Sequence, residues 1–160
     1  MVTVRKSRLT YGVGVLNRFL RGVHPESKLV RRGGGELQQP EAEWCRDVFD
    51  LFVAADQSVG LGDTVLRRYT PAEHGQAATV IHIYSAETSD VRFVTDDGVQ
   101  RCGTLRLELP TAADSDASDN RGRRREIQTR MTFGDTEIKV WALDVASGRS
   151  VRAAIDFLNK

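Results

Sequence analysis

The strongest constraint in this 160-residue chain is an alternation of apolar and polar residues with a period of two near its C-terminus. Residues 128–142 alternate on both sides of a Gly134–Asp135 step, which is typical of a turn. A second alternating pair of runs covers residues 143–157, joined by the tight segment Ala146–Arg149. Because successive side chains of a strand point to opposite faces, the pattern predicts strands with one solvated face. The C-terminal third is therefore expected to be an antiparallel meander.

Shorter runs of the same kind predict further strands at residues 9–15, 48–53, 64–70, 79–84 and 104–109. About eight short strands with little helix indicate an all-β, antiparallel sandwich or barrel. No helix longer than two or three turns is expected outside residues 17–47. Gly12 and Gly14 thin one face of the first of these strands and would admit a close neighbour.

Two segments interrupt the strand rhythm. Residues 17–47 contain Arg31–Gly35 and Gln38–Pro40, a composition that predicts a long surface excursion. The apolar pairs Phe19–Leu20 and Leu29–Val30 inside this insert must either pack back on the domain or be offered to a partner. Residues 110–125 are acidic and polar and then basic, and we expect a flexible loop there.

Charge and composition exclude several functional classes. The formal net charge is +1, so the chain lacks the global field of a dedicated nucleic-acid binder, and any electrostatic partner must be met by a local patch. With 40% hydrophobic and 28% charged residues, the composition is that of a globular protein. No membrane span or signal peptide is evident. The two cysteines, Cys45 and Cys102, fit a reducing compartment, so a cytoplasmic location is expected.

Residues able to carry chemistry are few. None of the three histidines, His24, His74 and His82, lies in a motif that supplies a nucleophile or a carboxylate partner, and we expect them to be hydrogen-bonded or solvated. Both cysteines are expected to be small buried hydrophobes. The run Gly33–Gly35 lacks the lysine of a phosphate-binding loop. The chain is therefore predicted not to be an enzyme, with no catalytic residue and no metal ligand.

The basic run Arg121–Arg125 has two interpretations. It is able to bind phosphate groups of nucleic acid or lipid. Three aspartates precede it in the same segment, and this favours a solvated loop edge. No nucleic-acid partner is predicted on this basis.

Seven motifs, in one order along nearly the whole chain, carry a resemblance to the C-terminal region of a divergent member of the 70-kDa heat-shock proteins: Leu9–Asn17, Trp44–Phe49, Ala55–Val59, Cys102–Leu105, Arg125–Ile127, Phe133–Lys139 and Ile155–Leu158. The resemblance implies a two-layer β-sandwich of eight strands whose loops form a cleft for an extended, apolar polypeptide. It also implies that the chain is a fragment, and that ATP is the ligand of an N-terminal domain absent here. No cofactor is expected in this chain.

The resemblance implies six peptide-binding positions: Val13, Leu16, Tyr69, Ala72, Thr79 and Ile81. Five are apolar or aromatic, whereas Thr79 puts a hydroxyl where the family has an aliphatic residue. Strand alternation puts Leu16 on the opposite face from Val13, so a pocket role for Leu16 requires the strand to end or bulge there.

The sequence also departs from the family pattern. Residues 17–47 are expected to replace a tight loop at the rim of the cleft, a fold without the helical lid is expected, and residues 1–8 are expected to form a linker without the usual apolar run. Residues 9–160 are predicted to form one domain.

The sequence leads to two functional hypotheses. The first is binding of unfolded or extended clients as an atypical chaperone domain in stress response, coupled to its own ATPase domain. The alternative is a protein-interaction or signalling scaffold whose ancestral cleft the insert has remodelled for specific partners.

Overall fold

The computed structural model describes residues 4–32, 42–70, 77–110, 125–134 and 136–156, and these residues are almost entirely strand. The elements are β1 (Val4–Lys6), β2 (Thr10–Arg18), the 3-10 turn η1 (Glu26–Lys28), β3 (Leu29–Arg32), β4 (Ala42–Val53), β5 (Ser58–Gly60), β6 (Thr64–Tyr69), β7 (Ala78–Ala86), β8 (Gln100–Glu108), β9 (Ile127–Phe133), β10 (Glu137–Asp144) and β11 (Ser150–Asp156). Short β1, β3 and β5 bring the described strands to eleven, above the eight predicted.

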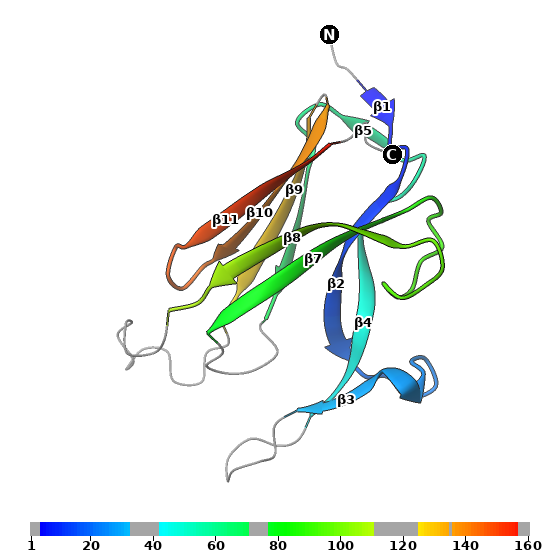
Figure 1. Cartoon of the computed structure of the whole chain (residues 1–160), viewed down its shortest axis with the longest axis vertical. Helices are drawn as coiled ribbons and strands as arrows, with labels where there is room; N and C mark the ends of the chain where they lie inside the picture. Colours follow the sequence, from blue (N-terminus) through cyan, green and yellow to red (C-terminus); the bar gives the residue numbers. More distant parts are fainter. Residues whose placement is uncertain (1–3, 33–41, 71–76, 111–124, 135, 157–160) are drawn as a thin grey trace.

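Two antiparallel sheets form the layers of a sandwich (Figure 1). One has the strand order β11-β10-β9-β6, and the other has the order β3-β4-β2-β7-β8. The predicted meander is confirmed, because β9, β10 and β11 pair consecutively. The expected all-β fold is also confirmed: η1, of three residues, is the only helical element in the described ranges.

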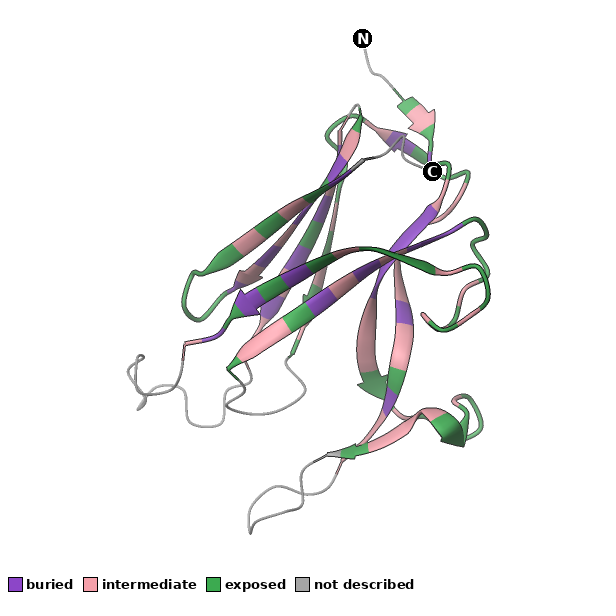
Figure 2. Ribbon diagram, viewed as in Figure 1, coloured by how far each residue is buried: buried purple, intermediate pink, exposed green. Residues whose placement is uncertain are grey.

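The core lies between the facing surfaces of the two sheets. Buried and exposed residues alternate along the strands, as Figure 2 shows for β8. The inward residues form one buried cluster: Tyr11, Val13, Phe52, Val53, Val59, Ile81, Ile83, Leu105, Leu107, Leu109, Ile127, Met131, Phe133, Ile138, Val140, Ala142 and Ile155. Burying each large side chain contributes about 1.5–3 kcal/mol relative to leaving it exposed. Both sheets contribute residues to this cluster, and the burial of these residues holds the two layers together.

The outer face of β2 is packed closely through its glycines. A Cβ atom at Gly12 would collide with the Asp50 carbonyl and lie 2.5 Å from Phe49 Cε1. A Cβ at Gly14 would lie 3.1 Å from Tyr84 Cε2. The predicted close neighbour of these glycines is therefore confirmed, and it is the Phe49 ring on β4 at one position and the Tyr84 ring on β7 at the other.

The described part of the insert at residues 17–47 is not loop throughout. β2 runs to Arg18, and Leu29–Arg32 and the first residues of β4 pair as β3 and β4. The apolar pair Leu29–Val30 is half-buried in the edge strand β3, where it pairs with Cys45 and Trp44 of β4. Residues 33–41 of this insert lie outside the described residues, as do residues 111–124 of the predicted flexible loop.

The described part of the predicted linker, residues 1–8, forms a small two-stranded sheet with β5. Val4–Lys6 pairs with β5, and the Ser7 hydroxyl, in a fully buried residue, donates to the Leu9 carbonyl at 2.7 Å. Two backbone hydrogen bonds tie Ser7 to Asp56 and Gln57. The described part of the predicted linker is therefore docked on the domain.

Candidate polypeptide-binding site

The strands β2 and β7 are neighbours over only part of their length. Their ladder joins Thr10–Val13 to Ile83–Ala86. Beyond it, β2 continues beside β4 while the first half of β7 continues beside β8, so the two strands diverge (Figure 1). We call residues 14–18 of β2 and 79–82 of β7 the fork. No ladder pair joins these two segments in the described structure, and strand edges of this kind can accept an extended polypeptide.

Val13 and Ile81, two of the predicted peptide-binding residues, lie in the core beside the fork. Their exposed fractions are 0% and 7%, and both belong to the cluster between the sheets. Val13 pairs with Ile83, two residues from Ile81 along β7. These two side chains therefore do not line an open groove. They are buried beside the fork, and we call them its apolar floor.

Leu16 lies at a β-bulge. The register between the strands shifts between Val15 and Asn17, where β2 contributes Leu16 and β4 contributes both Arg46 and Asp47. Asp47 has a φ of 61°, a left-handed conformation that is uncommon for a residue other than glycine. Leu16 is half-buried and outside the core cluster. The extra residue is on β4, so β4 is the bulged strand and Leu16 is the single β2 residue opposite the bulge.

Tyr69 joins the two sheets at one side of the sandwich. It is half-buried against the core, and its hydroxyl donates a hydrogen bond to Asp50 Oδ2 at 2.5 Å. Asp50 is the ladder partner of Val13. Burial, followed by the hydrogen bond and negative charge of Asp50, raises the pKa of Tyr69 well above its ordinary value. The neutral hydroxyl is therefore the form that the folded state favours.

Thr79 and Ala72 complete the predicted set. Thr79 is half-buried, pairs with Leu107 and lies on the same face of β7 as Ile81. Ala72 lies outside the described residues. The structure therefore brings Val13, Ile81 and Tyr69 into one apolar cluster, with Thr79 and Leu16 on the two arms of the fork.

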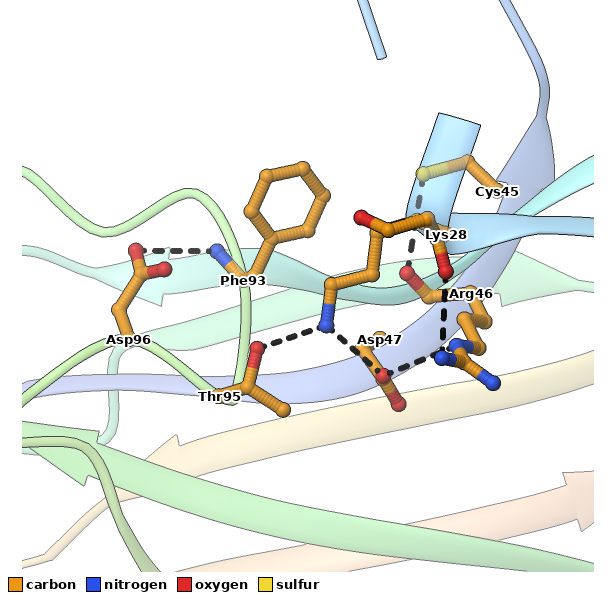
Figure 3. Close-up of polar contacts among 8 residues, drawn as sticks. Lys28, Cys45, Arg46, Asp47, Phe93, Thr95 and Asp96 are labelled. Carbon is orange, nitrogen blue, oxygen red and sulfur yellow. Dashed lines mark hydrogen bonds and ion pairs between the residues drawn. The ribbon is translucent and has the colours of Figure 1, made fainter. Parts of the chain in front are cut away.

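A polar cluster that sequence reasoning missed fixes the insert beside β4 (Figure 3). Lys28 Nζ lies 3.1 Å from Asp47 Oδ2 and donates to Thr95 Oγ1 at 2.8 Å. The same ammonium lies 5.4 Å from the centroid of the Phe93 ring. Arg46 donates to the Ser27 carbonyl at 3.2 Å. We call this the Lys28 cluster. Local sequence patterns could not predict the Lys28 cluster, because its residues come from three separate segments of the chain.

The β7–β8 loop, residues 87–99, is the third segment of that cluster. The Val94 amide donates to the Asp47 carbonyl at 2.8 Å, and the Phe49 amide donates to the Arg92 carbonyl at 3.0 Å. The Arg92 side chain reaches the Val23 carbonyl at 3.0 Å. The described insert is thus held against β4 and this loop, whose Val94 side chain also lies beside Gly14 of the fork.

The histidines and cysteines offer no catalytic pair in the described chain. His24 Nδ1 accepts a hydrogen bond from the Leu20 amide, and His82 Nδ1 bonds Thr104 Oγ1. Both are hydrogen-bonded, as expected, whereas His74 lies outside the described residues. Cys45 is buried, and burial raises the pKa of its thiol. Cys102 is exposed, against expectation, and it lies where the β7–β8 register shifts, so that it has no ladder partner on β7.

The structure corrects the expectation of a solvated loop at one position of the basic run. Arg125 is not a solvated loop residue: its Nε lies 3.1 Å from Oδ1 of Asp144, a carboxylate with 0% exposed side chain.

Among the described residues, no group of three histidine, cysteine or carboxylate side chains is placed to hold a metal ion. The described chain contains no helix that is both long and apolar enough to cross a membrane.

The fold defines an antiparallel β-sandwich domain in which two neighbouring strands of one sheet diverge at the fork, and comparison with known proteins assigns it further. The chain is 52% identical over 159 residues to human Heat shock 70 kDa protein 12A and 51% identical to the mouse protein of that name. It is 53% identical over 160 residues to human Heat shock 70 kDa protein 12B. These matches cover 99% of this chain but only 22% of each relative. No protein-family model matches the chain.

Identity at this level over almost the whole chain establishes homology to a segment of the 12A and 12B proteins, and it confirms the resemblance to 70-kDa heat-shock proteins. At the level of the family, it supports a domain of the substrate-binding type.

Proposed function

We propose that this domain binds extended apolar segments of other polypeptides without covalent chemistry, as the substrate-binding domain of an atypical 70-kDa heat-shock chaperone. The observation that carries the proposal is the fork between β2 and β7. Its two edges offer backbone groups to an incoming strand directly beside the apolar floor of Val13 and Ile81. Main-chain pairing with one central apolar anchor is a common mode of peptide recognition.

The rim of the fork suggests how a peptide is held. Leu16 is half-buried at the bulge, which makes it available to a ligand without being part of the core. Tyr69 presents an aromatic ring at the floor, and Thr79 adds a hydroxyl on the β7 arm. Ala72 is proposed as a peptide-binding residue on the sequence resemblance alone. Leu16, Tyr69 and Thr79 are therefore the residues we assign to contact with the peptide.

The proposal is tested with a fluorescently labelled heptapeptide that has a central leucine and with its aspartate counterpart. We expect a dissociation constant of about micromolar for the leucine peptide and binding at least ~10-fold weaker for the aspartate peptide, because one buried anchor dominates such interfaces. Leu16→Asp should abolish this binding while the melting temperature stays within a few degrees.

Leu20→Asp is the matched control, because Leu20 is a leucine of the insert that is 54% exposed and is not one of the fork residues. It should bind the leucine peptide as the unmodified chain does. Equal binding of the leucine and aspartate peptides by the unmodified chain would contradict the proposal.

The second candidate is a docking module that uses the insert. It is favoured by one observation: the Lys28 cluster fixes the insert while Leu20 and Val23 remain 54% and 56% exposed. A fixed segment with exposed apolar residues can bind a specific partner at low entropic cost. Under this function, Leu20→Asp abolishes capture of that partner and Leu16→Asp does not.

A further inference from the structure

A row of four side chains crosses the outer face of the sheet β11-β10-β9-β6, one from each strand. Arg152, Trp141, Arg130 and Leu66 are successive cross-strand partners in this order. Directly paired residues share one face of a sheet, and alternation puts this row opposite the core. The Arg130 guanidinium carbon lies 5.8 Å from the centroid of the Trp141 ring. We call these four residues the Arg–Trp row.

The Arg–Trp row has a surplus of positive charge. Arg130 and Arg152 are exposed, and neither makes an ion pair with a carboxylate among the described side chains. Lys139 lies in the adjacent row, and its contact with Glu137 is long, 3.9 Å, between two exposed groups. Such a pair contributes little. The face therefore forms a local cationic patch in a chain whose net charge is only +1.

A shallow hollow opens beside this row. It measures about 410 Å³ and is lined by Lys139, Arg152, Ala153 and Ala154. Ala154, the ladder partner of Lys139, is small and leaves space beside the two long cationic side chains. A phosphate group entering the hollow would meet a guanidinium and an ammonium, and guanidinium binds phosphate with two parallel hydrogen bonds.

We propose that this face of the four-stranded sheet binds single-stranded nucleic acid. Arg130, Arg152 and Lys139 hold backbone phosphates, and the half-buried indole of Trp141 with the plane of Arg130 supports an unpaired base. Open sheets that combine cations with stacking surfaces bind single strands in this way. An acidic peptide would use the charges but leave the indole unused, and a membrane would require more apolar surface than Leu66 supplies. This inference is independent of the function proposed for the fork.

The test measures fluorescence anisotropy of a labelled 12-nucleotide single-stranded RNA with the full chain. Binding should weaken ~20-fold between 50 and 200 mM salt if about three phosphates are neutralised. The double variant Arg130→Gln/Arg152→Gln should bind at least ~10-fold more weakly. The matched control, Arg101→Gln/Arg106→Gln, removes the same charge from exposed residues of β8 and should change binding less than about twofold.

A second readout reports on the row directly. In a Trp44→Phe background, Trp141 is the only tryptophan, and RNA should change its emission. The proposal is overturned if the two double variants lose affinity equally, if RNA leaves the Trp141 emission unchanged, or if the chain shows no RNA binding at 50 mM salt. It is also overturned if a polyglutamate peptide or vesicles of anionic lipid displace the RNA at equal charge concentration.

Discussion

The Tyr69 hydroxyl donates a 2.5 Å hydrogen bond to Asp50, and this bond joins the edge strand β6 of one sheet to β4 of the other. Beside it, Arg67 donates to the Leu51 carbonyl at 3.2 Å and lies over the Phe52 ring. Side-chain contacts therefore close this side of the sandwich, next to Val13 and the fork.

Tyr69→Phe should lower the free energy of unfolding by about 1–2 kcal/mol at pH 7, because Asp50 loses a hydrogen bond. The pKa of Tyr69 is raised in the folded state, so this stabilisation is complete below the ordinary pKa of 10.0 and is lost as the pH rises above it. The difference between the two proteins should therefore shrink above about pH 10, measured by urea unfolding. A difference that stays constant up to pH 11 would exclude this linkage.

Gly12→Ala should destabilise the domain by about 3 kcal/mol or more, because the new methyl group meets a backbone carbonyl and the Phe49 ring. Gly103→Ala is the control. Its Cβ would lie 3.3 Å from the end of the flexible Ile83 side chain, so the cost should be about 1 kcal/mol. Thermal and chemical unfolding measure both, and equal costs would show that β2 and β4 are not packed as closely as described.

Lys28→Met should release the insert from the β7–β8 loop. The Lys28 side chain is 16% exposed and makes two polar contacts, so we expect a loss of about 1–2 kcal/mol and faster amide exchange in residues 26–32. Arg21→Met removes an exposed pair with Glu43 and should cost less than about 0.5 kcal/mol. Unchanged amide exchange in Lys28→Met would mean that β3 alone holds the insert.

Arg125→Met should cost about 3–5 kcal/mol, because it leaves the buried Asp144 carboxylate without its cation. Ser147 donates to Asp144 Oδ2 at 2.6 Å, but no described group donates a hydrogen bond to Oδ1. The double variant Arg125→Met/Asp144→Asn should cost less than the sum of the single changes, since the charge is removed together with its partner. Strict additivity in this double-mutant cycle would show that the pair is not coupled.

The alternation of residues predicted most of the strands of the sandwich, for a local reason. Ile138 and Val140 bury one face of β10 whatever the neighbouring strand is, because the two-residue period alone decides which side chains share a face. The glycines of β2 were likewise predicted to admit a close neighbour. The motif order was sufficient to identify the heat-shock relationship that the comparisons confirm.

Part of the candidate site could not be predicted in this way. Pattern and resemblance named Val13, Ile81 and Leu16, but they could not show that the first two are sealed in the core while Leu16 lies at a bulge. They also treated Arg125 as a loop residue, because its buried partner Asp144 is 19 positions away.

The sequence by itself determined the all-β class, the meander of β9–β11, the apolar inner faces and the family relationship, since these depend on residue types at short, regular spacings. Only the tertiary structure decided that β2 and β7 part after four paired residues, that the insert docks on β4 through Lys28, and that Arg152, Trp141 and Arg130 form one row. These arrangements depend on strand register and on contacts between residues far apart in the sequence. Neither can be predicted from local patterns in a single sequence.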